Sequence, residues 1–335
     1  MKQVVVREFG GPEVLSIVDV PVPVLSPGEI LVRIHSAIVC FPDVLFRSGR
    51  YPLKEGVLPY IPCSEATGTV EALAPDVKGI EVGQNVFLNV LMTSPVELMG
   101  YARELAAVPA ASVITIPGNI DLGDAIGVGY YALAHSLLYR GNHALPKTLL
   151  QSGAAGSFAS SLVQLASLLG VTVIGTVSGD EKAEFARKSG AAHTINYQTE
   201  NVVERVLELT DGRGVDLIVD HIGGADFPKL LDALAPFGEI CVVNMEKGSA
   251  QTDLLAPFVT HSKRWPAVRY FAGHGFDKDM DTLKAHANEI VTLMAERGLR
   301  PVIARSFTMD KIAEAHRLVE TAAPMGRVVV AVDAK

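Results

Sequence analysis

Small residues gather where a short apolar run meets a helix-like run. The segment Gln151-Ser152-Gly153-Ala154-Ala155-Gly156-Ser157-Phe158-Ala159 joins a predicted strand at 148–151 to a predicted helix at 160–169. Small side chains let the backbone turn sharply and approach a ligand closely. A helix N-terminus offers free N–H groups to a phosphate. Positions 154, 156 and 159 read Ala-x-Gly-x-x-Ala, a degenerate form of the dinucleotide turn. The segment therefore predicts a pyrophosphate site. The alternative is a turn whose small residues only allow close helix packing.

The end of the next predicted strand, 172–177, indicates which dinucleotide is bound. Sites for NAD usually place Asp or Glu there to accept from the ribose 2′-hydroxyl. Here the chain reads Val177-Ser178-Gly179, and the first acid is Asp180. The Ser178 hydroxyl and the Lys182 ammonium would attract a 2′-phosphate, which predicts NADPH. In the alternative, Ser178 and Glu181 form a capping box and Lys182 is an ordinary surface lysine.

The elements around these residues alternate regularly. Strands are expected at 148–151, 172–177, 193–196, 217–220 and 239–243, and helices at 160–169, 181–188, 202–209 and 226–234. Strict alternation predicts a doubly wound α/β fold with a parallel sheet covered on both faces. The first 120 residues are β-rich, with short runs between Pro and Gly turns, and predict a small barrel or irregular sheet. A helix is expected at 122–140. The last part holds helices at 281–296 and 309–321 and strands at 302–307 and 326–332.

Composition narrows the class of protein. A chain of 335 residues suits two domains, and 49% hydrophobic residues can form a large core. With 29 Lys and Arg against 37 Asp and Glu, and no long basic run, binding to nucleic acid is not expected. No apolar stretch approaches the roughly 18 residues that span a bilayer, and the N-terminus does not resemble a signal peptide. Three scattered cysteines without a Cys-x-x-Cys pair favour a reduced, cytoplasmic setting.

Several segments, in order, resemble one known family: FGGPEVL (9–15), FRSGRYP (46–52), SGAAGS (152–157), VSGDEKAEFARKSGAAHTINY (177–197) and GRGVDLIVDHIGG (212–224). They are similar to the zinc-independent medium-chain dehydrogenase/reductases. The NADPH-dependent quinone oxidoreductases are the nearest group, and the enoyl thioester reductases are a neighbouring branch. The resemblance covers nearly the whole chain and thins between about 245 and 280. It implies a GroES-like, β-rich catalytic domain formed by 1–122 and 273–335, a Rossmann domain at 123–272, bound NADPH, and a homodimer joined through the Rossmann sheets.

The resemblance also assigns cofactor-binding residues. It implies that Ser178, Lys182 and Tyr197 hold the 2′-phosphate, although Tyr197 could equally be a packed surface aromatic. It places the pyrophosphate on Gly153, Ala154, Gly156, Ser157 and Phe158. It places the nicotinamide near Val128, Val243 and Asn244.

The wider superfamily includes zinc enzymes, so a metal has to be considered. Cys40 falls where those enzymes have their first zinc ligand. Their Gly-His-Glu motif reads Cys63-Ser64-Glu65 here, without the imidazole, and only Asp124 lies near the third ligand position. One thiol without its partners does not make a tetrahedral site, so no metal is predicted.

Two residues are candidates for the chemistry. Tyr51 falls where related enoyl thioester reductases carry a proton-donating tyrosine, and a phenol is protonated at neutral pH. In the alternative, Tyr51 only lines the substrate cleft. Cys40 replaces the Asn usual in the quinone reductases, and is either a weak donor to the substrate oxygen or a buried small side chain. His221, at a strand end on the cofactor side, is expected to pack near the adenine or ribose without transferring a proton.

The sequence therefore predicts a metal-free, NADPH-dependent reductase of a small-molecule acceptor, a quinone or an α,β-unsaturated carbonyl. Two alternatives stay open. An enoyl thioester reductase could use Arg47, Arg50 and Lys54 for a phosphopantetheine arm, although these residues also suit a solvated face. A non-catalytic NADPH-binding sensor or structural paralogue would bind the cofactor without turnover.

Overall fold

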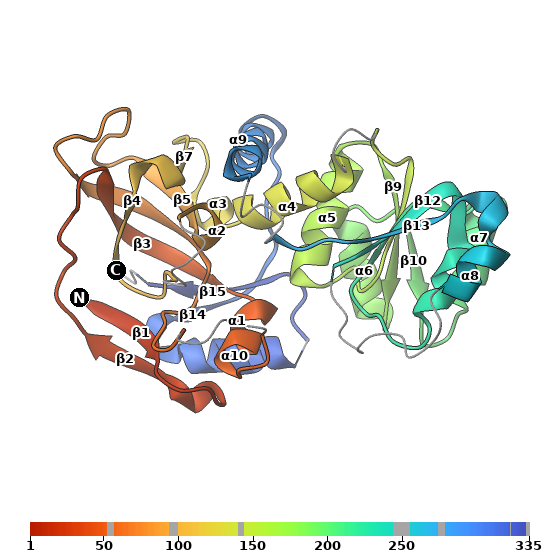
Figure 1. Cartoon of the computed structure of the whole chain (residues 1–335), viewed down its shortest axis with the longest axis horizontal. Helices are drawn as coiled ribbons and strands as arrows, with labels where there is room; N and C mark the ends of the chain where they lie inside the picture. Colours follow the sequence, from red (N-terminus) through yellow and green to blue (C-terminus); the bar gives the residue numbers. More distant parts are fainter. Residues whose placement is uncertain are drawn as a thin grey trace. The chain divides into compact units, whose positions relative to one another are not determined.

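The computed structural model describes residues 1–51, 57–93, 100–139, 144–243, 255–273, 279–321 and 323–332. The chain forms two compact units (Figure 1). The first unit combines both chain ends, Met1–Leu133 and Phe276–Lys335, and the second is Ala134–Gly275. The sequence-based division places the corresponding changes at 122/123 and 272/273.

The first unit is built on a mixed sheet in the order β14-β15-β3-β4-β5-β7, with β6 also paired to β3. All of these pairs are antiparallel except β14 with β15, and β15 from the C-terminal part pairs with β3 through Val328 and Val39 (Figure 1). Alternate residues of β3, including Ile30, Val32 and Ile34, enter one buried core. The strands are β3 (Glu29–Val39), β4 (Glu65–Leu73), β5 (Asn85–Asn89), β6 (Leu105–Pro109), β7 (Ile114–Ile116), β14 (Ile303–Thr308) and β15 (Arg327–Ala331).

Shorter elements complete this unit. A separate antiparallel pair is formed by β1 (Lys2–Val6) and β2 (Leu15–Asp19). The α-helices are α1 (Phe41–Arg47), α2 (Val90–Thr93), α3 (Leu122–Ala125), α9 (Met280–Arg297) and α10 (Ile312–Glu320).

The second unit holds a six-stranded sheet in the order β10-β9-β8-β11-β12-β13, with every neighbouring pair parallel. Register aligns Ile174, Leu150, Ile218 and Ile240 across four strands, and all four belong to one buried cluster. The strands are β8 (Thr148–Gln151), β9 (Thr172–Val177), β10 (His193–Asn196), β11 (Val215–Asp220), β12 (Leu234–Val242) and β13 (Ala267–Tyr270); the α-helices are α5 (Ser157–Leu168), α6 (Asp180–Lys188), α7 (Val202–Leu209) and α8 (Leu255–Thr260). The predicted fold class, a doubly wound sheet with a β-rich GroES-like domain, is confirmed.

Two predicted helices are wrong in detail. The helix expected at 122–140 is interrupted between α3 and α4 (Val128–Tyr139), and the guanidinium of Arg327 binds the carbonyls of Ile126 and Gly127 at the interruption. The helix expected at 226–234 is instead a 3-10 helix, Phe227–Ala233. In the parts that the structure describes, no helix is both long and apolar enough to cross a membrane.

Candidate functional site

The turn predicted to bind pyrophosphate, within 151–159, connects β8 to α5. β8 ends at Gln151 and α5 begins at Ser157, with Gly156 as an N-cap that makes no side-chain hydrogen bond to the helix. The first N–H groups of α5 are therefore not covered by a capping side chain. Gly153 has a φ of +60°, the left-handed region that favours glycine.

The turn also packs closely on β9. The N–H groups of Gly153 and Ala154 donate to the Oγ1 and the carbonyl of Thr176, at 3.1 and 3.0 Å. A Cβ on Gly175 would lie 2.6 Å from the Cβ of Ala154, so both positions need small residues. The small residues therefore allow close packing of the turn on β9, and ligand binding at the turn stays a prediction.

The residues proposed for the 2′-phosphate lie at neighbouring strand ends. Ser178 follows β9 and Tyr197 follows β10, whose last residue Asn196 is in register with Val177. The Tyr197 N–H donates to the Val177 carbonyl at 3.1 Å, and the Tyr197 side chain is 48% exposed. Lys182 is half-buried in the first turn of α6.

The capping-box alternative for Ser178 is wrong. Gly179 is the N-cap of α6, and no side chain caps this helix end. Ser178 therefore lies one residue before the cap position, outside the helix. The cap position is thus one residue later than a Ser178 box with Glu181 requires.

The residues proposed for the nicotinamide are distributed over both units. Val243 follows β12 and donates its N–H to the carbonyl of Asp220 at 2.9 Å. Val128 is fully buried at the start of α4, in the first unit. Asn244 lies outside the described residues.

The strand order reverses between β8 and β11, and ligands of doubly wound sheets bind at the carboxyl edge of such a reversal. His221 follows β11, and its N–H donates to the Ser152 Oγ at 2.8 Å. Two buried side-chain atoms at this edge, Gln151 Oε1 and His221 Nε2, have no hydrogen-bond partner among the described residues. Buried polar atoms without partners are uncommon and fit a site that a polar ligand completes.

Cys40 is buried in the first unit, where it is the N-cap of α1. Its backbone N–H and its thiol both donate to Asp43 Oδ2 at 2.9 Å. The other oxygen, Asp43 Oδ1, accepts from the N–H of Cys63 at 2.9 Å. Burial, and then the nearby Asp43 charge, raise the pKa of the Cys40 thiol well above its ordinary value. Cys40 is therefore a protonated thiol engaged inside the protein.

Sequence reasoning missed the polar network around Cys40. Tyr130 makes a hydrogen bond with Cys40, and burial raises the pKa of the Tyr130 phenol. Glu65, 4% exposed, accepts from Asn89 Nδ2 at 3.0 Å. Burial raises the pKa of Glu65 to about 7, although the positive charge of Arg327 acts in the opposite direction.

Arg327 and Glu65 hold the start of α4. The buried guanidinium of Arg327 donates from Nη1 to the Ile126 carbonyl at 2.9 Å and from Nη2 to the Gly127 carbonyl at 3.2 Å. A Cβ on Gly129 would lie 2.1 Å from Glu65 Oε1, so the carboxylate lies directly against this backbone. The sequence signal was a charged residue inside an apolar run, as in Arg327-Val328-Val329-Val330.

The structure does not bring the two catalytic candidates together on α1. Cys40 caps the first turn of the helix, whereas the ring of Tyr51 stacks on Phe46 in the last turn, with 4.1 Å between centroids and 20° between planes. Among the described residues, no group of three or more His, Cys, Asp and Glu side chains could hold a metal ion.

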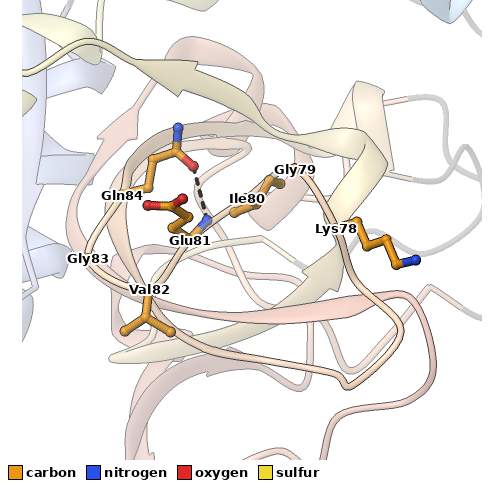
Figure 2. Close-up of a pocket in the computed structure, with 7 residues that line it drawn as sticks. All are labelled: Lys78, Gly79, Ile80, Glu81, Val82, Gly83 and Gln84. Carbon is orange, nitrogen blue, oxygen red and sulfur yellow. Dashed lines mark hydrogen bonds between the residues drawn. The ribbon is translucent and has the colours of Figure 1, made fainter.

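A surface hollow of the first unit contains none of these residues in its lining. It is lined by Lys78–Gln84, in the connection between β4 and β5, where the Glu81 N–H donates to Gln84 Oε1 at 3.3 Å (Figure 2). Its lining comes from one exposed turn and contains no predicted site residue, so we assign it no binding function.

Comparison with known proteins places this geometry in a family. Residues 26–118 match the alcohol dehydrogenase GroES-like domain, and residues 159–285 match the zinc-binding dehydrogenase domain. A quinone oxidoreductase of Pseudomonas aeruginosa is 33% identical, with 94% of each chain covered. A 2-haloacrylate reductase of a Burkholderia species is 31% identical, with 97% of each chain covered.

A crystal structure of Escherichia coli quinone oxidoreductase complexed with NADPH matches with a TM-score of 0.83 and 26% identity, covering 99% of this chain and 100% of the other. The two domains match in sequence order, and the relatives match over almost their full length. The chain therefore belongs to the medium-chain dehydrogenase/reductase family of oxidoreductases.

Proposed function

We propose that the protein is an NADPH-dependent reductase that transfers hydride to a quinone or an α,β-unsaturated carbonyl without a metal. The observation that carries this proposal is the uncapped phosphate turn at the strand reversal, with Ser178 and Lys182 and no acid at the end of β9. Quinones and 2-haloacrylates, after which two relatives are named, are both conjugated electrophiles.

The described residues fit the cofactor. In the proposal, the diphosphate lies against Gly153, Ala154, Gly156, Ser157 and Phe158 at the start of α5, where no side chain caps the helix, and the φ of +60° at Gly153 supports this turn. Ser178, Lys182 and Tyr197 receive the 2′-phosphate, and Val128, Val243 and Asn244 contact the nicotinamide. When bound, the nicotinamide supplies the hydride, and the protein orients the reactants and excludes water.

The protein must also stabilise the negative charge that develops on the acceptor oxygen when the hydride is transferred. We assign Tyr51 to this role, as a hydrogen-bond or proton donor. Cys40 is assigned to the wall of the substrate site, where its thiol hydrogen is already directed to Asp43. This contact favours a structural role for the thiol over stabilisation of an oxyanion.

The proposal is metal-free because the zinc-ligand positions carry unsuitable side chains. Ser64 stands where the zinc enzymes have histidine, and Cys40 is a protonated thiol with a raised pKa, whereas zinc binds thiolate. Activity that survives a strong chelator would support this point, and activity lost with the chelator and restored by zinc would overturn it.

We further propose that the protein forms a homodimer, in which a second copy of this chain binds at the edge of the second unit. β13 is the last strand of its sheet, and no described strand pairs with its outer side. Val268 and Tyr270 on β13 are 41% and 63% exposed, and Trp265, which precedes β13, packs its exposed ring against the exposed ring of Phe237, with 5.6 Å between centroids. An open, apolar strand edge is a surface that proteins normally cover. A mass measurement in solution should give a dimer for the wild type and a monomer for Tyr270→Lys; a wild-type monomer would contradict the proposal. We also propose a cytoplasmic location, which rests on the three buried cysteine thiols, all of which lie outside disulfide bonds. Fractionation of the source cells tests it.

One of the three basic residues that suggested an enoyl thioester reductase does not suit that role. Arg47, which was considered for a phosphopantetheine arm, is 1% exposed and forms an ion pair with Glu320 of α10. It cannot lie on an open basic groove. Arg50 is exposed, and Lys54 lies outside the described residues. The non-catalytic alternative is favoured by the engaged Cys40 thiol and is tested by turnover.

The experiment is NADPH oxidation by the purified protein, with chelator present, against a small quinone, an enone, an enoyl thioester and an aldehyde. NADH is run in parallel. We expect turnover of the quinone or the enone, faster with NADPH. Turnover only with the thioester, or NADPH binding without any turnover, would favour the corresponding alternative.

A further inference from the structure

His221 lies beside the phosphate turn, within the second unit. Its N–H donates to the Ser152 Oγ at 2.8 Å, which ties the carboxyl ends of β11 and β8 together. These two strands flank the strand reversal, where a dinucleotide crosses a sheet of this kind. The backbone of His221 is therefore joined to Ser152, the residue before Gly153 of the proposed diphosphate site.

The loop after β11 holds His221 in place. The buried carboxylate of Asp220 accepts from the N–H groups of Ile222 and Gly223, at 3.2 and 2.8 Å. Gly223 and Gly224 follow with φ of +65° and +76°, which favour glycine. This turn is specified by its residue types, so the backbone position of His221 is built into the fold.

The imidazole packs over the start of α5. It meets the ring of Phe158 edge-on, with 5.7 Å between centroids and 64° between planes, and Phe158 is the second residue of α5. His221 Nε2 is buried and has no hydrogen-bond partner among the described residues. A buried ring nitrogen without a partner is costly, and a ligand oxygen at this turn would satisfy it.

The charge state limits what His221 can do. Burial lowers the pKa of the imidazole to about 4, so the ring is neutral at pH 7. The segment 148–170 contains no Lys or Arg, so a diphosphate here would rely on neutral donors and the α5 terminus. A neutral imidazole can add one N–H donor to that set.

We propose that His221 is a dinucleotide-binding residue whose imidazole ring donates a hydrogen bond to an oxygen of the cofactor's diphosphate–ribose backbone. This inference rests on the proposed function, because it requires a dinucleotide at the turn. It concerns the part of the cofactor that NADH and NADPH share. It therefore predicts a contribution separate from that of Lys182.

The test is equilibrium binding of NADPH and NADH to the full-length protein, followed by nucleotide fluorescence. His221→Phe keeps a ring against Phe158 and removes the donor, and His221→Gln keeps a neutral N–H donor. His193→Gln is the matched control, because His193 is exposed at the opposite, amino end of β10. Melting temperatures without nucleotide establish that each variant is folded.

We expect His221→Phe to raise the Kd for NADPH and the Kd for NADH by the same factor, about tenfold. The Kd values of His221→Gln should stay within about threefold of those of the wild type. The ratio of the Kd of His221→Phe to that of wild type should be constant from pH 6 to pH 8. A ratio that falls as pH rises would contradict a neutral donor. Unchanged binding by His221→Phe would overturn the inference alone, with water as the partner of Nε2. Failure of the wild type to bind either nucleotide would overturn the proposed function and the inference together.

Discussion

The thiol of Cys40 donates a hydrogen bond to the carboxylate of Asp43, with 2.9 Å between Sγ and Oδ2. The same carboxylate binds the backbone of Cys63. Asp43 therefore joins the start of α1 to the segment before β4. In the wider superfamily the position of Cys40 belongs to a metal ligand, whereas here its hydrogen is used inside the protein.

Cys40 is expected to be inert toward thiol reagents in the folded protein. Its pKa is raised by burial and by Asp43, and the thiolate is the reactive form. Labelling at pH 7.5 should be roughly 100-fold or more slower than for free cysteine, and all three cysteines should react in denaturant. Cys241, fully buried in the second unit, is an internal reference. Rapid labelling of one cysteine with loss of activity would instead identify a reactive thiol.

Lys182→Ala tests the choice of nucleotide. Loss of one charged partner of a phosphate should raise the KM for NADPH about tenfold and leave the KM for NADH nearly unchanged. Lys188→Ala is the control, because Lys188 lies at the far end of α6 and pairs with Glu184 on the surface. Equal effects of the two variants, or equal effects on both nucleotides, would place the 2′-phosphate elsewhere.

Tyr51→Phe tests the proton donor. If the phenol donates during reduction, kcat should fall about 100-fold while the KM for NADPH changes little. Tyr60→Phe is a suitable control, because the Tyr60 hydroxyl is buried and has no partner among the described residues. Full activity of Tyr51→Phe would mean that Tyr51 only packs against the acceptor, as its stacking on Phe46 allows.

Glu65 should make stability depend on pH. Burial raises its pKa from 4.5 to about 7, with Arg327 opposing and Asp43 adding to the rise. The folded protein therefore binds this proton more tightly than the unfolded chain does. The resulting stabilisation is complete below pH 4.5 and is lost as pH rises through about 7.

Glu65→Gln removes this titration. Between pH 4.5 and 8, the unfolding free energy of the wild type should fall by on the order of 3 kcal/mol more than that of Glu65→Gln. Urea unfolding at several pH values measures this difference. Parallel pH profiles for the two proteins would show that Glu65 titrates normally in the folded state.

The alternating half of the chain was predictable from local pattern. The predicted bounds of β9, β10 and α7 agree with the structure, because buried parallel strands and amphipathic helices have a periodicity that neighbouring residues reveal. The turn between β8 and α5 was predictable for the same reason, since its small residues and its flanking elements are contiguous, and its binding of phosphate stays a prediction.

The polar network of the first unit was not predictable in this way. Arg327 binds the carbonyl of Gly127, 200 residues away in the chain, where a helix that the local pattern favours is interrupted. Glu65 is a charged residue that pattern reasoning places on the surface, and its hydrogen-bond partner Asn89 is distant in sequence. Cys40 and Asp43 are close in sequence, so their contact is local. The burial that raises the pKa of the Cys40 thiol comes from the packing of the whole unit and cannot be seen in the local sequence.

The most direct test of the central claim follows the hydride itself. NADPH deuterated at C4 of the nicotinamide, on each face in separate reactions, is incubated with the protein, a chelator and an enone, and the product is examined by NMR. The account predicts that the label from one face is transferred, as a single deuterium at the β-carbon of a saturated ketone. Deuterium at the carbonyl carbon of an alcohol, dependence on added zinc, or product without deuterium would contradict it.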